Sequence, residues 1–147
     1  MEGRDGGNPE RVSRILVAVD GSEPSRRALN LAADVAKALG AEITILHVIE
    51  VEELPSLIGE AEDARADEDA QIILGTAAKL VMAKGVTPKI VVRKGHPTRQ
   101  ILRYSEAYSP QLIVLGSRGV TGARGVLLGS VSSAISKKAR ASVVLVR

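Results

Sequence analysis

The sequence contains no cysteine, no phenylalanine and no tryptophan, and it has only two tyrosines. Without cysteine, disulfide bonds and thiolate chemistry are excluded. With so few aromatic residues, the core must be built from Val, Leu, Ile and Ala. The chain has only two histidines, which are too few for a histidine-rich metal site. No apolar run reaches the roughly 18 residues of a membrane helix, and the N-terminus carries no hydrophobic signal segment. These absences predict a cytoplasmic protein with no membrane segment.

The net charge of +3 is unevenly distributed over the 147 residues. Residues 50–69 hold nine acidic side chains and one basic one, without the spacing of a calcium-binding loop, so we expect a solvated surface there. Several cations are expected near the glycine-rich stretch 116–130 and the helix after it: Arg118, Arg124, Lys137, Lys138 and Arg140. A polyanionic small molecule explains this charge as well as DNA does. Because aromatic stacking platforms and known recognition signatures are missing, we expect no nucleic-acid partner.

Apolar runs alternate with segments of helical periodicity along the chain. These runs predict five strands, at residues 15–19, 42–49, 89–93, 112–115 and 142–146. The continuous apolar run 15–19 is typical of a strand buried on both faces, whereas 89–93 is more polar at its ends and is expected nearer an edge. Four helices are predicted between them, at about residues 23–39, 66–84, 97–108 and 130–141. This alternation predicts an α/β doubly wound parallel sheet with helices on both faces. We expect one domain over residues 13–147, after a disordered tail of residues 1–12.

Three residues predict where the first helix begins and ends and how the second helix packs. Ser22 is expected to cap the N-terminus of the first helix, and Gly40 is expected to end it. Gly75 lies inside the second helix, where glycine costs up to about 1 kcal/mol relative to alanine. We therefore expect a close packing contact at Gly75.

The stretch 112–134 carries the clearest functional signal. The apolar run 112–115 stops at Gly116, and the pattern Gly116-x-x-Gly119, nine residues, Gly129-Ser130 follows before helical periodicity begins. A buried strand, a glycine-rich connection and a helix N-terminus together form an anion site, because N–H groups point outward, no Cβ blocks close approach and the helix dipole favours negative charge. The P-loop and dinucleotide-binding patterns are absent. The stretch indicates a phosphate-binding cradle; the alternative is a loop whose glycines only make turns.

This spacing resembles the nucleotide-binding signature of the universal stress protein family, in its ATP-binding branch, and the resemblance covers roughly residues 12–147. It implies a Rossmann-like fold of the adenine nucleotide alpha hydrolase-like type, with five parallel strands in the order 3-2-1-4-5. In that order the winding reverses between the first and fourth strands, which is where such sheets bind ligands. Asp20, after the first strand, is then expected to lie beside Gly116, at the end of the fourth.

The residues expected to bind a nucleotide come from both turns of this crevice and from the second strand. They are Ala18, Val19, Asp20, Val48, Leu115, Gly116, Arg118, Gly119, Gly129, Ser130 and Val131. The resemblance implies that Gly116, Gly119 and residues 129–131 contact ribose and phosphate. It also implies that Asp20 and Val48 line the adenosine half, and the apolar residues beside them are expected to form walls suited to a purine.

From the residues alone, several of these roles have alternatives. Asp20 could serve only as an Asx-type turn at a strand end, and Ser130 could serve only as a helix N-cap. Arg118 and Arg124 could reach phosphates with a forked guanidinium, or they could be solvated loop charges.

No catalytic set can be assembled from the sequence. His47, within a strand, and His96, at a helix start, are expected to be structural, and no nucleophile lies beside a base. Phosphoryl transfer needs a positioned metal and a water-orienting group, and the sequence designates neither. We therefore predict binding, with slow hydrolysis at most. The resemblance implies a stress-response protein that binds ATP with Mg²⁺ or Mn²⁺ on the phosphates; the alternative is an interaction or signalling module that binds AMP or cyclic AMP, or whose site is empty.

The last strand predicts self-association. Val143 to Val146 are apolar at every position and are expected at an edge of the sheet. An exposed apolar edge invites aggregation unless it is paired. Pairing of this strand across a two-fold axis gives a symmetric homodimer, which the resemblance also implies.

Overall fold

The computed structural model describes residues 11–51, 59–118 and 129–147. In these ranges the elements are β1 (Arg14–Ala18), α1 (Glu23–Leu39), β2 (Glu42–Glu50), α2 (Gly59–Ala83), β3 (Lys89–Gly95), α3 (Pro97–Tyr108), β4 (Leu112–Gly116), α4 (Ser130–Lys138) and β5 (Ser142–Val146). Of the tail predicted for residues 1–12, only Arg11 and Val12 lie within the described residues. None of the helices in these ranges combines the length and the apolar character that a membrane span requires.

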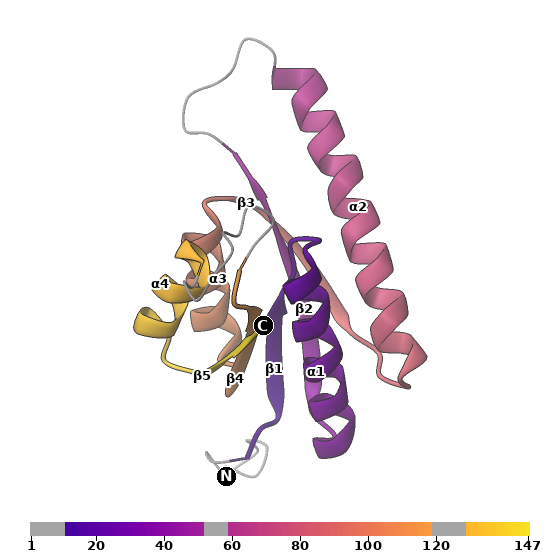
Figure 1. Ribbon diagram of the computed structural model, residues 1–147, viewed down its shortest axis with the longest axis vertical. Coiled ribbons are helices and arrows are strands. Elements are labelled where there is room, and N and C mark those ends of the chain that lie inside the picture. The colour runs from indigo at the N-terminus through magenta and orange to yellow at the C-terminus, as the bar shows by residue number, and fades with distance from the viewer. Residues whose placement is uncertain (1–10, 52–58, 119–128) are drawn as a thin grey trace.

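The five strands form one parallel sheet in the order β3-β2-β1-β4-β5, which confirms the predicted fold class and strand order (Figure 1). β1 is the central strand, and its Val17 lies opposite Ile45 of β2 and Val114 of β4. All three side chains are buried, as expected for strands covered on both faces. Because β1 neighbours both β2 and β4, the winding reverses between β1 and β4.

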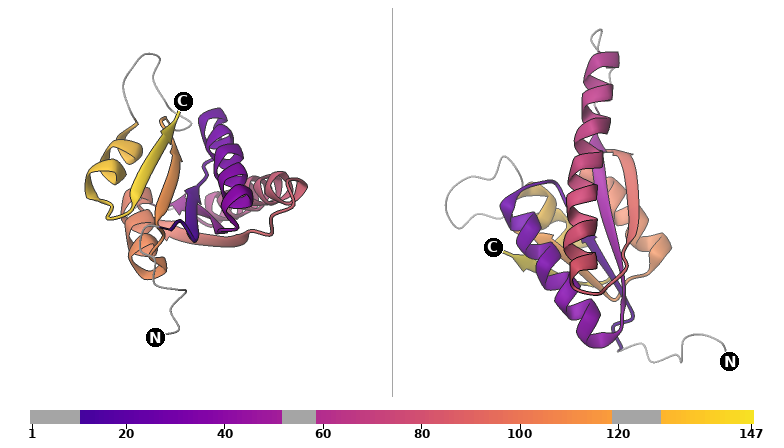
Figure 2. Two further views of the ribbon diagram at one scale, coloured as in Figure 1. Left: turned by 90° about the horizontal axis from the view of Figure 1, so that it is seen from below. Right: turned by 90° about the vertical axis from the view of Figure 1, so that its right-hand side faces the viewer.

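Two helices cover each face of the sheet (Figure 2). On one face, α1 and α2 contribute side chains such as Ala32 and Leu74 to a core that includes Ile15. On the other face, Ile101 of α3 and Ile135 of α4 belong to a second core. Apart from Tyr104, the buried members of both cores are aliphatic, as the composition predicts.

The ends of α1 are set by the predicted residues. The Ser22 hydroxyl accepts a hydrogen bond from the Ser25 N–H over 3.3 Å, and Gly40 adopts the left-handed conformation with φ 66°. α4 is shorter than the predicted helix over 130–141: it ends at Lys138, because Ala139 is extended (φ −70°, ψ 144°) and leads the chain toward β5.

The expectation for α2 is wrong in two respects. The helix begins at Gly59, before the predicted start near residue 66, because periodicity marks only the part of a helix that has an apolar stripe. Gly75 makes no close packing contact: among the described residues, no atom outside its own helix backbone lies within 4 Å of the place that a Cβ would occupy. Gly75 is exposed on the surface of α2.

Candidate functional site

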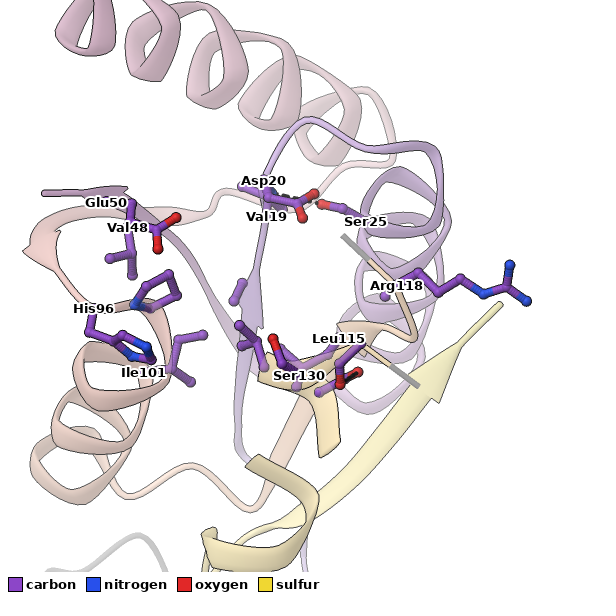
Figure 3. A pocket seen from close by; sticks show the side chains of 16 residues that line it. Val19, Asp20, Ser25, Val48, Glu50, His96, Ile101, Leu115, Arg118 and Ser130 are labelled. Carbon is purple, nitrogen blue, oxygen red and sulfur yellow. Dashed lines mark hydrogen bonds between the residues drawn. The ribbon is translucent and has the colours of Figure 1, made fainter. Parts of the chain in front are cut away.

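A cavity of about 590 Å³ lies at the carboxyl ends of β1, β2 and β4, where the winding reverses (Figure 3). Every predicted site residue within the described ranges lines it: Ala18, Val19, Asp20, Val48, Leu115, Gly116, Arg118, Gly129, Ser130 and Val131. Gly119 and Arg124 lie outside the described residues. Two turns that are far apart in the sequence therefore share one cavity.

Six further residues line the cavity that sequence reasoning missed: Ser25, Glu50, His96, Pro97, Ile101 and Ser132. Four of them come from the end of β2 and the start of α3, which reach the same edge of the sheet because all strands are parallel. His96, expected to be structural, is exposed and lines the cavity, and its side chain makes no capping hydrogen bond. The strand order implied by the resemblance could have revealed this part of the lining, because it places the end of β2 beside the end of β1.

The turn after β1 is held by side-chain hydrogen bonds. The Asp20 N–H donates to the Ser25 hydroxyl over 3.1 Å, and the Asp20 Oδ1 accepts from the Ser22 N–H over 2.9 Å. His47 Nδ1 lies 2.7 Å from the carbonyl oxygen of Val19. Asp20 therefore forms the Asx-type turn that was considered as its only role. Asp20 also lines the cavity.

Gly116 is required by packing, a reason that the sequence did not reveal. A Cβ at this position would lie 2.8 Å from the carbonyl carbon of Pro24 and 2.8 Å from the backbone nitrogen of Ser25. Real Cβ atoms do not approach backbone atoms so closely. Glycine at this position thus allows the first turn of α1 to pack closely against β4. The contact of Gly116 with a nucleotide stays a prediction.

The connection between β4 and α4 is tied together where it begins and ends. The Ser117 carbonyl accepts the Gly129 N–H over 2.7 Å and the Ser132 hydroxyl over 2.9 Å. The Ser117 N–H donates in turn to the Val146 carbonyl over 2.7 Å. Ser117 and Ser132 are buried, so these bonds are shielded from water. The start of α4 is thereby fixed against the end of β4.

α4 directs its N-terminus toward the cavity. Gly129 is the N-cap residue (φ −63°, ψ 157°), so the alternative in which Ser130 is the N-cap is wrong. Ser130 is the first residue of the helix and lines the cavity. Ser133 N–H donates to the Gly129 carbonyl over 2.9 Å, whereas the preceding amides, of Ser130 and Val131, have no carbonyl partner within the helix. Such amides and the positive end of the helix dipole favour an anion.

The cations at the end of α4 are not near this cavity, contrary to expectation. α4 runs antiparallel to the strands, so its last turn lies at the opposite edge of the sheet. Lys138 and Arg140 line a second cavity of about 520 Å³ at that edge. Lys137 is also in the last turn, where cations offset the negative end of the dipole. Within the described part of the chain, Arg118 alone of the expected cations lines the first cavity.

Asp20 and Glu50 bring carboxylates to the first cavity, whereas the guanidinium of Arg118, another lining residue, points away from it (Figure 3). In the three described ranges, no group of three or more His, Cys, Asp or Glu side chains is placed to hold a metal ion. The cavity thus combines apolar walls, carboxylates and a helix N-terminus.

A doubly wound sheet with a cavity at its reversal and a helix N-terminus facing that cavity defines the nucleotide-binding α/β class. Residues 11–147 match the model of the universal stress protein family, and the chain belongs to that family. Its strand order is that of the adenine nucleotide alpha hydrolase-like fold.

The matches to known relatives cover nearly the whole chain. Over 146 residues the chain is 32% identical to universal stress protein YxiE of Bacillus subtilis, a match that covers 92% of this chain and 99% of the relative. The structure of universal stress protein UspA from Lactobacillus plantarum is 27% identical with a TM-score of 0.75, covering 93% of this chain and 99% of that one. A family protein from Arabidopsis thaliana with AMP bound is 20% identical with a TM-score of 0.68, covering 91% and 90%; this likeness concerns the fold.

Proposed function

We propose that the protein binds an adenine nucleotide in the first cavity, and that this ligand is ATP with Mg²⁺ or Mn²⁺ on its phosphates. The observation that carries the proposal is an apolar pocket joined to a helix N-terminus in one cavity at the reversal of the winding. Its volume of about 590 Å³ falls within the roughly 300–1,000 Å³ of small-molecule sites. The AMP bound to the Arabidopsis relative supports an adenine ligand.

The base and sugar fit the part of the cavity formed by β1, β2 and α3. Ala18, Val48 and Ile101 give this part apolar walls, which suit the faces of a purine. Asp20 and Glu50 place carboxylates beside these walls, and a carboxylate accepts hydrogen bonds from amino or hydroxyl groups.

The phosphates fit the part formed by β4 and α4. Ser130 and Val131 offer amides at the helix N-terminus, and Ser130 adds a hydroxyl. Arg118 lines this half, and its guanidinium, which points away from the cavity in Figure 3, would turn inward to reach a phosphate. Gly119 is included on the resemblance alone. A divalent cation, when bound, would neutralise charge on the phosphate oxygens.

We propose binding without rapid turnover, as part of a stress response in the cytoplasm. The two buried hydroxyls on the cavity wall are engaged in holding the chain. Ser25 Oγ accepts the Asp20 N–H, and Ser132 Oγ donates to the Ser117 carbonyl. Neither is therefore arranged as an activated nucleophile, which supports a binding site with slow hydrolysis at most.

We also propose a homodimer through β5, from Val143 to Val146. β5 is an edge strand, and its apolar side chains are only partly buried although they pack against both cores. Pairing with a second copy would satisfy the backbone groups on the open side of this strand. Sedimentation velocity should show a dimer that Leu145→Pro, which removes one backbone donor, converts to a monomer. A monomeric wild-type protein would contradict this proposal.

Differential scanning calorimetry tests nucleotide binding directly, after EDTA has removed carried-over metal. Mg-ATP at a hundred times its dissociation constant adds about 2.7 kcal/mol of stability. For a chain of this size the melting temperature should rise by roughly 5–11 °C. Ser130→Ala should reduce the shift, whereas Ser136→Ala, an exposed serine further along α4, should not. A larger shift with AMP than with Mg-ATP would favour AMP, and no shift with either would refute the proposal.

A further inference from the structure

One peptide group at the rim of the cavity is hydrogen-bonded by a side chain on each side. It is the peptide between Val19 and Asp20. Its carbonyl oxygen lies 2.7 Å from Nδ1 of His47, and its N–H donates to the Ser25 hydroxyl over 3.1 Å, the bond dashed in Figure 3. His47 is 9% exposed and Ser25 is 4% exposed. Buried side chains from β2 and α1 therefore hold the same peptide.

The His47 ring extends the connection between β1 and β2 beyond their backbone pairing. That pairing ends with Ala18 opposite Leu46, and the Val19 N–H still donates to the Leu46 carbonyl over 2.9 Å. The next bond comes from the imidazole. Because a carbonyl oxygen can only accept, Nδ1 of His47 carries a hydrogen and donates a hydrogen bond to the Val19 carbonyl oxygen.

The first turn of α1 holds the other side of the peptide. Ser25 accepts the Asp20 N–H with its hydroxyl and donates its own N–H to the Ser22 hydroxyl. The Asp20 carboxylate accepts the Ser22 N–H. Asp20 is thus held through both its backbone and its side chain.

We propose that His47 is a positioning residue of the nucleotide site: with Ser25 it holds the Val19–Asp20 peptide so that Asp20 is presented to the cavity. This inference rests on the proposed function. Among the described residues, His47 is not part of the cavity lining, whereas Asp20 is. His47 therefore acts through Asp20 and not on the ligand, and it is more than the structural core histidine that its place in a strand suggests.

Two replacements of His47 separate its hydrogen bond from its bulk. His47→Asn keeps an N–H donor near the place of Nδ1, and His47→Leu fills similar space without a donor. Each is combined with Asp20→Ala in a double-mutant cycle. Such a cycle detects whether two residues act through one another, whereas general destabilisation affects both backgrounds alike.

Isothermal titration with Mg-ATP gives the first readout. His47→Leu should weaken binding about tenfold, within the range of coupled neighbours, and His47→Asn should restore most of the affinity. In the Asp20→Ala background, His47→Leu should cause no further loss. An equal loss in both backgrounds, or no loss in either, would overturn the positioning role. If His47→Leu does not fold, Ser25→Ala takes its place in the cycle, because it removes the partner on the other side of the same peptide.

Amide hydrogen exchange in the ligand-free protein gives a readout that does not depend on nucleotide. The Asp20 amide should exchange about tenfold faster in His47→Leu than in the wild type, as local opening becomes easier. The rate should return toward the wild-type value in His47→Asn, and the Ile135 amide in α4 should stay unchanged throughout. Failure of the wild type to bind Mg-ATP would refute the proposed function alone. An unchanged Asp20 exchange rate would refute the hold of His47 on this peptide.

Discussion

The two connections that leave the sheet at the reversal of its winding are held in different ways. The short turn from β1 to α1 is fixed by side chains: His47 bonds to the Val19 carbonyl, Ser25 to the Asp20 N–H, and the Asp20 carboxylate to the Ser22 N–H. The long connection from β4 to α4 is fixed at its base, where the Ser117 carbonyl joins Gly129 and Ser132. The short turn is thus determined residue by residue, whereas the long one has its two ends tied together.

Gly116, where β4 ends, packs closely against the first turn of α1, and filling this position should have the largest effect. Gly116→Ala places a Cβ 2.8 Å from backbone atoms of Pro24 and Ser25. Overpacking against backbone should destabilise the fold by about 3 kcal/mol. Thermal melting should show a midpoint lowered by roughly 6–12 °C.

Gly129→Ala is the matched control on the long connection. There a Cβ would lie 3.4 Å from its nearest neighbours, which is ordinary contact. Its cost should not exceed about 1 kcal/mol, the price of a poorer N-cap residue. Equal melting midpoints for the two variants would show that Gly116 is not required by packing against α1.

Cutting the tie at the base of the long connection should have an intermediate effect. Ser132→Ala removes the hydroxyl whose one hydrogen is shared between the Ser117 carbonyl at 2.9 Å and the Gly129 carbonyl at 3.1 Å. The loss of a buried hydrogen bond should cost about 1–2 kcal/mol in urea denaturation. It should also weaken Mg-ATP binding, because the start of α4 is no longer fixed.

Ser136→Ala on the same helix is the control for this variant. Ser136 is exposed and donates to the Ser133 carbonyl over 2.8 Å. Its replacement should change stability by less than about 0.5 kcal/mol, as at most surface positions. If the two serine variants were equally stable and bound nucleotide equally, the tie would have no role.

The smallest effect is expected from the cap of the short turn. Ser22→Ala removes the hydroxyl that accepts the Ser25 N–H over 3.3 Å. Loss of an N-cap should lower the free energy of unfolding by about 1 kcal/mol. Ser22→Asp, which can still accept this bond, should recover most of it in the same urea titration. A neutral Ser22→Ala would show that Asp20 and Ser25 hold the turn without the cap.

The contrast between a turn determined by its own residues and a connection fixed by distant contacts also explains which features the sequence could reveal. β1 and β4 are continuous apolar runs, and Ser22 and Gly40 carry local cap chemistry, so their places follow from neighbours in the chain. The end of α4 depends on the backbone of Ala139, which no periodic pattern marks. Local signals therefore predict elements well and their last turns poorly.

The site was predicted where its residues follow a strand directly and missed where only tertiary packing brings them in. Asp20 and Gly116 come immediately from β1 and β4, so the strand order places them together. Glu50 and His96 reach the cavity only because β2 ends and α3 begins at the same edge, and no motif marks them. The packing of Gly116 against α1 likewise involves a segment distant in sequence.

An NMR titration of the ¹⁵N-labelled protein with Mg-ATP can locate the nucleotide, because it distinguishes the two cavities. The Asp20, Gly116 and Ser130 amides at the first cavity should shift, whereas those of Gln111 and Arg140 at the second cavity should stay unchanged. Shifts confined to Gln111, Arg140 and their neighbours, or no shifts at millimolar nucleotide, would contradict nucleotide binding in the first cavity.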